Sequence, residues 1–232
     1  MPKISIIIRT FNEEKHIGNL LTAIEAQEER DYEIILVDSG STDRTLELAT
    51  PKCNQVIQIA SRDFTFGYSL NRGYSVARGE YLVVVSAHAY PEDSKWLSAL
   101  LAPFSDVKVG VVYGRHIGAQ TTKFSEWRDF ETYFGGEEKK KHPLPYFFNN
   151  ANAAVRASLW NQFHFNEHLT GLEDIFLARM LIAKGYKVAY APKGAVYHIH
   201  AETWKQVYNR YRREAIAARR IGIPRPPFAV AS

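Results

Sequence analysis

Residues 4–43 read ISIIIRTFNEEKHIGNLLTAIEAQEERDYEIILVDSGSTD, and this stretch decides the fold. Apolar runs rich in β-branched residues stand near its two ends, at 4–8 and 33–37, and predict two buried strands. Between them, residues 13–27 carry apolar side chains at helical spacing from Ile17 onward, which predicts an amphipathic helix. A strand, a helix and a second strand in this order are typical of a parallel βαβ unit.

The same alternation continues outward from this stretch. Further strands are expected at 55–59, 80–86, 108–113, 187–190 and 194–200, and further helices at 43–49, 69–77, 173–184 and 202–221. Gly185 ends the helix before it, and the charged, proline-containing segment 135–146 is expected to be an exposed loop. The pattern predicts an α/β protein with a mostly parallel central sheet flanked by helices.

Length and composition limit the class of protein. The chain has 232 residues, of which 46% are hydrophobic and 23% charged, so it is long enough for one sizeable α/β domain with a real core. The net charge of +4 is too small to indicate nucleic acid as the main ligand. No apolar run is long enough to span a bilayer, and the single cysteine, Cys53, excludes an internal disulfide. These features favour a cytoplasmic protein.

Polar residues follow three of the predicted strands. They are Arg9 to Glu14, Asp38 to Asp43 and Ser86 to Ala89. Ligands of open parallel sheets bind beyond the carboxyl ends of the strands, so these segments are candidate binding loops. None contains a GxGxxG or Walker A pattern, which argues against a dinucleotide oxidoreductase or a P-loop enzyme. Helix capping is an alternative role for Asn12, Ser41 and Asp43.

Residues 4–43 resemble the opening of the family 2 glycosyltransferases, which have the GT-A fold and carry TYNE-like and VDSGSTD motifs. The resemblance continues through Ala77-Arg78-Gly79-Glu80-Tyr81 and Gly171-Leu172-Glu173-Asp174 and covers roughly residues 3–200. It implies an inverting transferase that moves a sugar from a nucleotide-diphosphate sugar to a hydroxyl acceptor, in polysaccharide or glycan biosynthesis. Position by position, it assigns the nucleotide pocket to Thr10, Asn12, Glu13, Asp38 and Ser39.

The resemblance also implies an organisation of the chain. A single GT-A domain is expected over 1–222, with a nucleotide-binding half at 1–115 and an acceptor-binding half at 116–200. A C-terminal helix would fill 201–222, and the proline-rich residues 223–232 would form a tail or linker.

One departure from the family pattern concerns the metal. Family members place a DxD or related acidic motif after the fourth strand, where carboxylates bind a divalent cation, whereas this chain has Ser86-Ala87-His88. Either His88 is itself a metal ligand or diphosphate contact, or the site is metal-free or inactive. A second departure leaves Arg72, after Asn71, as the stand-in for a phosphate-binding arginine that relatives carry before the asparagine.

A second candidate metal ligand lies near the end of the chain. His198 and His200 would project from the same face of a strand, with Glu202 beside them if the strand continues. One packed and one exposed histidine is the alternative. GT-A enzymes often supply a late histidine to the metal, and motif position favours His198; nitrogen ligands would favour Mn²⁺ over Mg²⁺.

Acceptor activation requires a carboxylate to take the proton of the attacking hydroxyl. The ED-like motif makes Asp174 the candidate base. Acidic residues also stabilise a helix N-terminus, which is the alternative role for Glu173 and Asp174. The stretch 148–156, FNNANAAVR, resembles a family segment beside donor sugar and acceptor and adds Asn152 to the donor site; turn and backbone bonding is the alternative.

The C-terminal helix collects the positive charge. Trp204, Val207, Tyr208, Tyr211, Ala215 and Ala218 are expected on one stripe, with basic residues on the opposite surface. That surface is either merely solvated, or contacts anionic lipid or a lipid-linked diphosphate acceptor at the inner face of the membrane. Arg210 and Arg213 could alternatively reach the donor diphosphate. A non-catalytic nucleotide-sugar or glycan-binding module is the alternative function.

Overall fold

The computed structural model describes residues 1–120, 122–136, 144–199 and 203–223. Its strands are β1 (Ile4–Thr10), β2 (Tyr32–Asp38), β3 (Gln55–Gln58), β4 (Tyr81–Ser86), β5 (Ala89–Pro91), β6 (Val109–Gly118), β7 (Asn152–Arg156) and β8 (Lys187–His198). Its α-helices are α1 (Ile17–Glu25), α2 (Thr45–Ala49), α3 (Phe66–Ser75), α4 (Trp96–Leu101), α5 (Phe124–Tyr133), α6 (Ala157–Trp160), α7 (Glu173–Ala183) and α8 (Trp204–Arg220). Short 3₁₀ turns cover Thr50–Lys52, Ser61–Asp63 and Ala102–Ser105.

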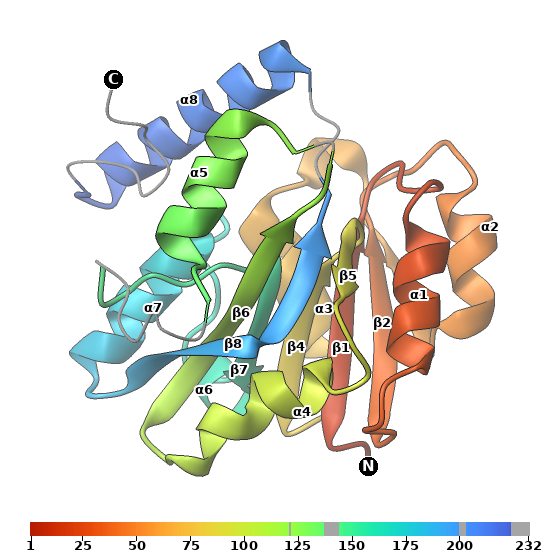
Figure 1. Ribbon diagram of the computed structural model, residues 1–232, viewed down its shortest axis with the longest axis horizontal. Helices are drawn as coiled ribbons and strands as arrows, with labels where there is room; N and C mark the ends of the chain where they lie inside the picture. The colour runs from red at the N-terminus through yellow and green to blue at the C-terminus, as the bar shows by residue number, and fades with distance from the viewer. Residues whose placement is uncertain (121, 137–143, 200–202, 224–232) are drawn as a thin grey trace.

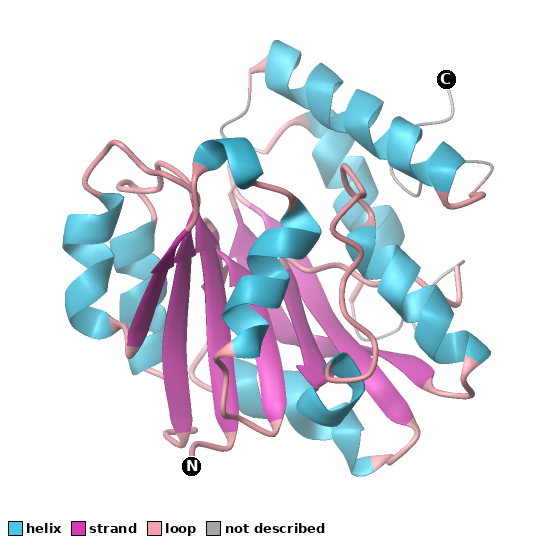
Figure 2. Cartoon of the chain, turned by 180° about the vertical axis from the view of Figure 1, so that it is seen from behind, coloured by secondary structure: helices cyan, strands magenta, loops and turns pink. Residues whose placement is uncertain are grey.

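The described strands form one sheet in the order β3-β2-β1-β4-β7-β6-β8-β5. The first four are parallel, β7 is antiparallel to both β4 and β6, and β8 is parallel to β6. Helices cover both faces of the sheet (Figures 1 and 2). The predicted α/β class and mostly parallel sheet are therefore confirmed.

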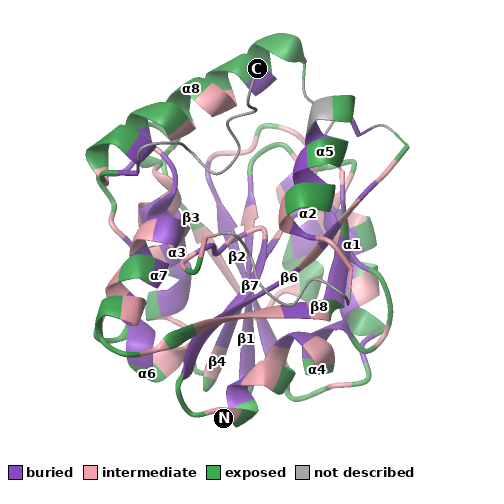
Figure 3. Ribbon diagram, turned by 60° about the vertical axis from the view of Figure 1, so that its left-hand side comes forward, coloured by how far each residue is buried: buried purple, intermediate pink, exposed green. Residues whose placement is uncertain are grey.

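The apolar residues of β1 explain why helices cover both faces of the sheet. Ile4, Ile6 and Ile8 pack on one face with α1 and α4, and Ile7 packs on the other with α3 and α7. Successive residues of a strand point to opposite faces, so a continuous apolar run requires two layers of helices. Figure 3 shows the strands buried between exposed outer helix surfaces.

Several elements differ from the sequence expectations. The segments predicted as separate strands at 187–190 and 194–200 form the single strand β8, which pairs with β6 through a register shift between Gly114 and His116. The helices α4 and α5 were not predicted. Part of the expected loop at 135–146, the end of the 194–200 strand and most of the 223–232 tail lie outside the described residues.

The inward face of the C-terminal helix matches the predicted one only in part. Val207, Ala217 and Ala218 are buried, whereas Trp204 and Tyr208 are 73% and 67% exposed. The predicted apolar stripe is therefore confirmed at Val207 and Ala218 and wrong at Trp204 and Tyr208. The reason is that α8 lies across the carboxyl edge of the sheet, beside α5 and α7 (Figure 1), and covers a polar cavity as well as apolar residues of α7.

Candidate active site

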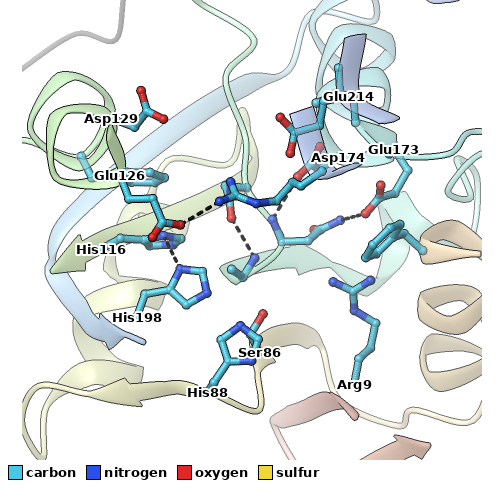
Figure 4. A pocket seen from close by; sticks show the side chains of 18 of the residues that line it. Arg9, Ser86, His88, His116, Glu126, Asp129, Glu173, Asp174, His198 and Glu214 are labelled. Atoms are coloured by element: carbon cyan, nitrogen blue, oxygen red, sulfur yellow. Dashed lines mark hydrogen bonds and ion pairs between the residues drawn. The ribbon is translucent and has the colours of Figure 1, made fainter. Parts of the chain in front are cut away.

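A cavity of about 260 Å³ opens at the carboxyl edge of the sheet. Its charged and polar lining comes from segments far apart in the sequence: Arg9 of β1, Ser86 and His88 after β4, His116 of β6, Glu126 and Asp129 of α5, Asn149 and Asn150 before β7, Glu173 and Asp174 of α7, His198 of β8, and Arg210, Arg213 and Glu214 of α8. We call this cavity the pocket. Figure 4 shows the histidines and Glu126 on one side of it and Arg9 and Glu173 on the other.

The candidate base stands at the start of α7. The Asp174 carboxylate accepts hydrogen bonds from the backbone N–H groups of Asn150, at 3.2 Å, and Ile175, at 2.8 Å. Burial in the pocket wall, together with the neighbouring charge of Glu173, raises the pKa of Asp174 to about 8. A carboxyl group with this pKa can take up a proton near neutral pH, as a general base must.

Glu173 and Asp174 accept hydrogen bonds from different groups of the same residue, Asn150. Glu173 is 4% exposed and accepts a hydrogen bond from the Asn150 side-chain amide at 3.2 Å. Asp174 is less enclosed and faces the pocket. Asn150 therefore bridges both acids and fixes their orientation.

The backbone before these acids is strained. Leu172 has φ +58° and ψ +24°, the left-handed region, which costs a side-chain-bearing residue about 1–2 kcal/mol. Its side chain is 5% exposed and packs with Ile175, Ala217 and Ala218. Packing between α7 and α8 thus stabilises the strained conformation of Leu172, after which α7 begins at the acid pair. Backbone strain of this kind is concentrated at active sites.

The loops after β1 and β2 form one hydrogen-bonded network. Asp38 is 1% exposed, accepts hydrogen bonds from the Thr10 hydroxyl at 3.1 Å and from the Ser41 hydroxyl, and also accepts from the Gly40 and Ser41 backbone N–H groups at 2.9 Å each. Asn12, with φ +56°, accepts at its side-chain oxygen from the Thr42 N–H at 2.8 Å. The residues predicted to bind the nucleotide therefore lie close together, and many of their hydrogen-bonding groups already bond to each other within the loops.

Two neighbours of this network complete the predicted set. The Ser39 N–H donates to the Thr10 carbonyl at 3.0 Å, which ties the ends of β2 and β1 together. Glu13 contacts His88, with Glu13 Oε1 2.8 Å from His88 Nδ1. The β1–α1 loop thereby adjoins the turn after β4, at the edge of the pocket.

Two predicted donor contacts lie away from the pocket lining. Arg72 is an exposed residue of α3. Asn152 is fully buried, accepts a hydrogen bond from the Trp96 indole at 2.9 Å and donates to the carbonyls of Gly194, at 2.8 Å, and Arg115, at 3.3 Å. Its amide is thus engaged inside the protein, whereas Asn149 and Asn150 of the same segment line the pocket.

The histidines at the pocket do not form a converged ligand set. The rings of His88 and His198 are stacked, with centroids 5.1 Å apart and planes 7° apart, and His198 Nδ1 lies 3.2 Å from His116 Nδ1. A ring nitrogen binds a metal in the plane of its ring, so two nearly parallel rings do not direct lone pairs at one point. Within the described ranges, no group of three His, Cys, Asp or Glu residues could hold a metal ion. The arrangement does not fit a bound cation, and no catalytic step is derived through one.

The sequence placed Arg9 in the candidate binding loop after β1 but assigned no role to its side chain. The β1 alternation places it on the same face as Ile7, where its guanidinium lies 5.1 Å from the centre of the Phe66 ring. Burial lowers the pKa of Arg9, and the nearby Glu173 and Asp174 partly offset this effect. The available signal was a charged residue following four apolar positions of a buried parallel strand.

The inward face of α8 supplies further charges. Arg210 forms a 2.8 Å ion pair with the buried Glu126, and the Tyr211 hydroxyl donates to Asp129 at 2.9 Å. The arginines at 210 and 213 were expected on a basic outer surface or at a diphosphate; they line the pocket. These contacts to α5 hold α8 over the pocket.

Comparisons with known proteins identify the family. The family model described as glycosyl transferase family 2 matches residues 5–163. The O-antigen chain rhamnosyltransferase RfbN of Salmonella typhimurium is 31% identical over 222 residues, covering 90% of this chain and 70% of the relative. The corresponding enzyme WbaN of Salmonella anatum is 29% identical, covering 91% and 70%.

Solved structures agree on the fold. The mannosyltransferase PcManGT from Pyrobaculum calidifontis, in complex with GDP-Man and Mn²⁺, superimposes with a TM-score of 0.74 at 21% identity, covering 98% of this chain and 67% of that one. TarS of S. aureus in complex with UDP-GlcNAc gives 0.68 at 21% identity, covering 93% and 65%. The chain therefore belongs to glycosyl transferase family 2, has the GT-A fold, and is a glycosyltransferase of glycan biosynthesis.

Proposed function

We propose that the chain transfers a sugar with inversion from a nucleotide-diphosphate sugar to a hydroxyl of a glycan or lipid-linked acceptor, with Asp174 as the base. The observation that carries this proposal is the Asp174 carboxyl at the pocket, with its pKa raised to about 8, beside the loops that follow β1, β2 and β4. The donor nucleotide would bind at Thr10, Asn12, Glu13, Asp38 and Ser39, with the sugar extending into the pocket.

The reaction would be a single displacement. Asp174 takes the proton of the acceptor hydroxyl as its oxygen bonds to the anomeric carbon, and the bond from that carbon to the nucleotide diphosphate breaks on the opposite side. Asn150, whose N–H groups orient both acids, holds the base in position. Catalysis then depends on alignment of the two substrates and on positive groups facing the leaving diphosphate.

The raised pKa of Asp174 predicts the pH dependence of transfer. The ionised carboxylate is the active form, so kcat/KM should rise about tenfold per pH unit below pH 8 and level off above about pH 9. Initial rates between pH 5.5 and 9.5, at acceptor concentrations well below KM, measure this rise. A profile that is flat from pH 6 to 9 would contradict the assignment of the base.

The predicted manganese site at His88 and His198 stays a prediction. Titration calorimetry of UDP, GDP, dTDP and CDP, each with Mn²⁺ and with chelator, tests it on the wild type and on His88→Ala. Binding that needs both Mn²⁺ and His88 would support a histidine in place of the DxD carboxylates. Equal binding in chelator would leave a metal-free transferase, in which His88 contacts the diphosphate or orients Glu13.

A contact with the cytoplasmic face of the membrane is supported by the start of α8. Trp204 and Tyr208 are exposed, Lys123 Nζ lies 4.7 Å from the Trp204 ring centre, and the neighbouring Phe124 is 80% exposed. Aromatic rings beside basic side chains suit a membrane interface with anionic lipids. No described helix combines the length and apolar character needed to cross a bilayer.

Liposome flotation tests the membrane contact. Wild type should float with vesicles containing anionic lipid, and the double variant Trp204→Ser/Tyr208→Ser should remain in the soluble fraction, because the aromatic anchors are lost. Val107→Ser, which removes an exposed apolar side chain just before β6, serves as the control. Equal partitioning of wild type into neutral and anionic vesicles would contradict an electrostatic contribution.

A further inference from the structure

Helix α8 has two chemically different faces, as the 100° spacing of helical residues separates them. The inward face packs on α7 and walls the pocket; it consists of Val207, Arg210, Arg213, Glu214, Ala217 and Ala218. The other side, which we call the outer face, consists of Trp204, Lys205, Tyr208, Asn209, Arg212, Ala215, Ile216 and Arg219, all exposed and none of them acidic. Aromatic and aliphatic side chains interspersed with basic ones are typical of a helix that lies in the plane of an anionic membrane surface.

The start of α5 extends the outer face. Lys123 Nζ lies 4.7 Å from the centre of the Trp204 ring, and the neighbouring Phe124 is exposed. The two helices lie side by side (Figure 1), so the extended surface exists only while α8 rests on α5. A bilayer that contacts both helices therefore binds the docked position of α8 more tightly than any position away from α5.

The docked position of α8 is held by few apolar contacts. Three of its 17 residues are buried. Ala217 and Ala218 pack with Leu172 in a small apolar cluster that is distinct from the two larger clusters around the sheet. The ion pair and the hydrogen bond described above join α8 to α5. Elements with little buried apolar surface open at a lower free energy than the core, so an external contact can shift the position of α8.

The position of α8 affects the start of α7. The packing of Leu172 against Ala217 and Ala218 stabilises its left-handed backbone conformation, and its carbonyl accepts the Phe176 N–H at 3.0 Å in the first turn of α7. If α8 moves away, Leu172 loses the packing that offsets its strain. The first turn of α7, which carries Asp174, is then less ordered.

We propose that an anionic membrane surface holds α8 in its docked position and thereby orders the start of α7, where the candidate base stands. Negative lipid headgroups suit Lys205, Arg212 and Arg219, and the interfacial region suits the aromatic rings beside them. The inference rests on the proposed function in that the ordered segment is the proposed catalytic one. In this arrangement the membrane completes the site rather than only recruiting the enzyme.

Hydrogen–deuterium exchange of the full chain tests the coupling. The protein is mixed with phosphatidylcholine vesicles that contain either no anionic lipid or about one third phosphatidylglycerol. Anionic vesicles should slow exchange of the Ile175 and Phe176 N–H groups about tenfold or more, and neutral vesicles should not. Because Ile175 is buried beneath α8, protection there reports ordering of α7 and not shielding by lipid. Salt at about 0.5 M should remove the effect by screening the exposed charges.

A charge-reversal variant and its matched control identify the surface responsible. Lys205→Glu/Arg212→Glu changes two residues of the outer face that do not line the pocket, so exchange without vesicles should equal that of the wild type. With anionic vesicles this variant should gain no protection at Ile175 and Phe176. Lys108→Glu/Lys184→Glu makes the same change in charge at two exposed lysines, one before β6 and one after α7, at the opposite edge of the sheet. It should respond to vesicles as the wild type does.

Protection confined to α8, with unchanged exchange at Ile175 and Phe176, would overturn the coupling while leaving the membrane contact itself in place. A full response to anionic vesicles by Lys205→Glu/Arg212→Glu would overturn it as well. The exchange experiment uses no sugar substrate. Failure of sugar transfer in a wild-type assay is therefore distinguished from failure of the coupling.

Discussion

Asp174→Asn should lower kcat for sugar transfer by about 10²–10⁴-fold, the usual contribution of a general base. The amide keeps the shape of the carboxyl but has one oxygen, so it can accept only one of the two hydrogen bonds that the Asn150 and Ile175 N–H groups donate to separate oxygens of Asp174, and it cannot take up the acceptor proton. The affinity for the donor nucleotide should change little. Steady-state rates combined with calorimetric titration of the nucleotide measure both quantities.

A second carboxyl at the pocket provides the control for this experiment. Asp129 accepts a hydrogen bond from the Tyr211 hydroxyl and stands on α5, across the pocket from Asp174 (Figure 4). Asp129→Asn should retain most of the transfer rate. Near wild-type turnover by Asp174→Asn with intact donor binding would show that Asp174 is not the base. An equal loss of turnover in both variants would indicate that the charge of the pocket matters rather than proton transfer.

Asn152→Ala should destabilise the fold by about 2–4 kcal/mol, because it leaves the buried Trp96 indole N–H without an acceptor and removes a donor from two carbonyls. For a chain of this length, the melting temperature should fall by roughly 10 °C. Circular dichroism melts of purified variants measure the change.

Asn149→Ala is the matched asparagine variant. Asn149 lines the pocket, and its side chain accepts a hydrogen bond from the Ala151 N–H at 2.9 Å, so truncation should cost less stability. If Asn152→Ala instead melts like the wild type and loses donor affinity, the family-based assignment of Asn152 to the donor site holds.

The order of strands and helices could be predicted because it follows from local patterns. Buried parallel strands must be apolar on both faces. The apolar runs that form β1, β2 and β4 can therefore be recognised as strands without knowing which strands they pair with. The helix α5 was missed because its buried residues Glu126 and Asp129 are charged and pair with residues of α8. No local pattern predicts burial that depends on a partner about 80 residues away.

The site was predicted unevenly for the same reason. Strand ends and motif matches directed attention to His88, Asp174 and His198, and all three line the pocket. Asn152 and Arg72 come from equally motif-like segments, yet one is engaged inside the protein and the other is exposed. Motif position gives the segment, whereas the direction of a side chain depends on what packs against it.

The sequence alone determined that this chain forms a sheet with a polar carboxyl edge and carries an acid pair at a helix start, because strand burial, helix periodicity and helix capping are local properties. Only the tertiary structure decided which groups share the pocket. More than 160 residues separate Arg9 from Asp174, and 39 residues separate Asp174 from Arg213. The three side chains meet because β1, α7 and α8 converge at one edge of the sheet. Their protonation and pairing follow from that shared, partly dehydrated environment, which no single segment contains.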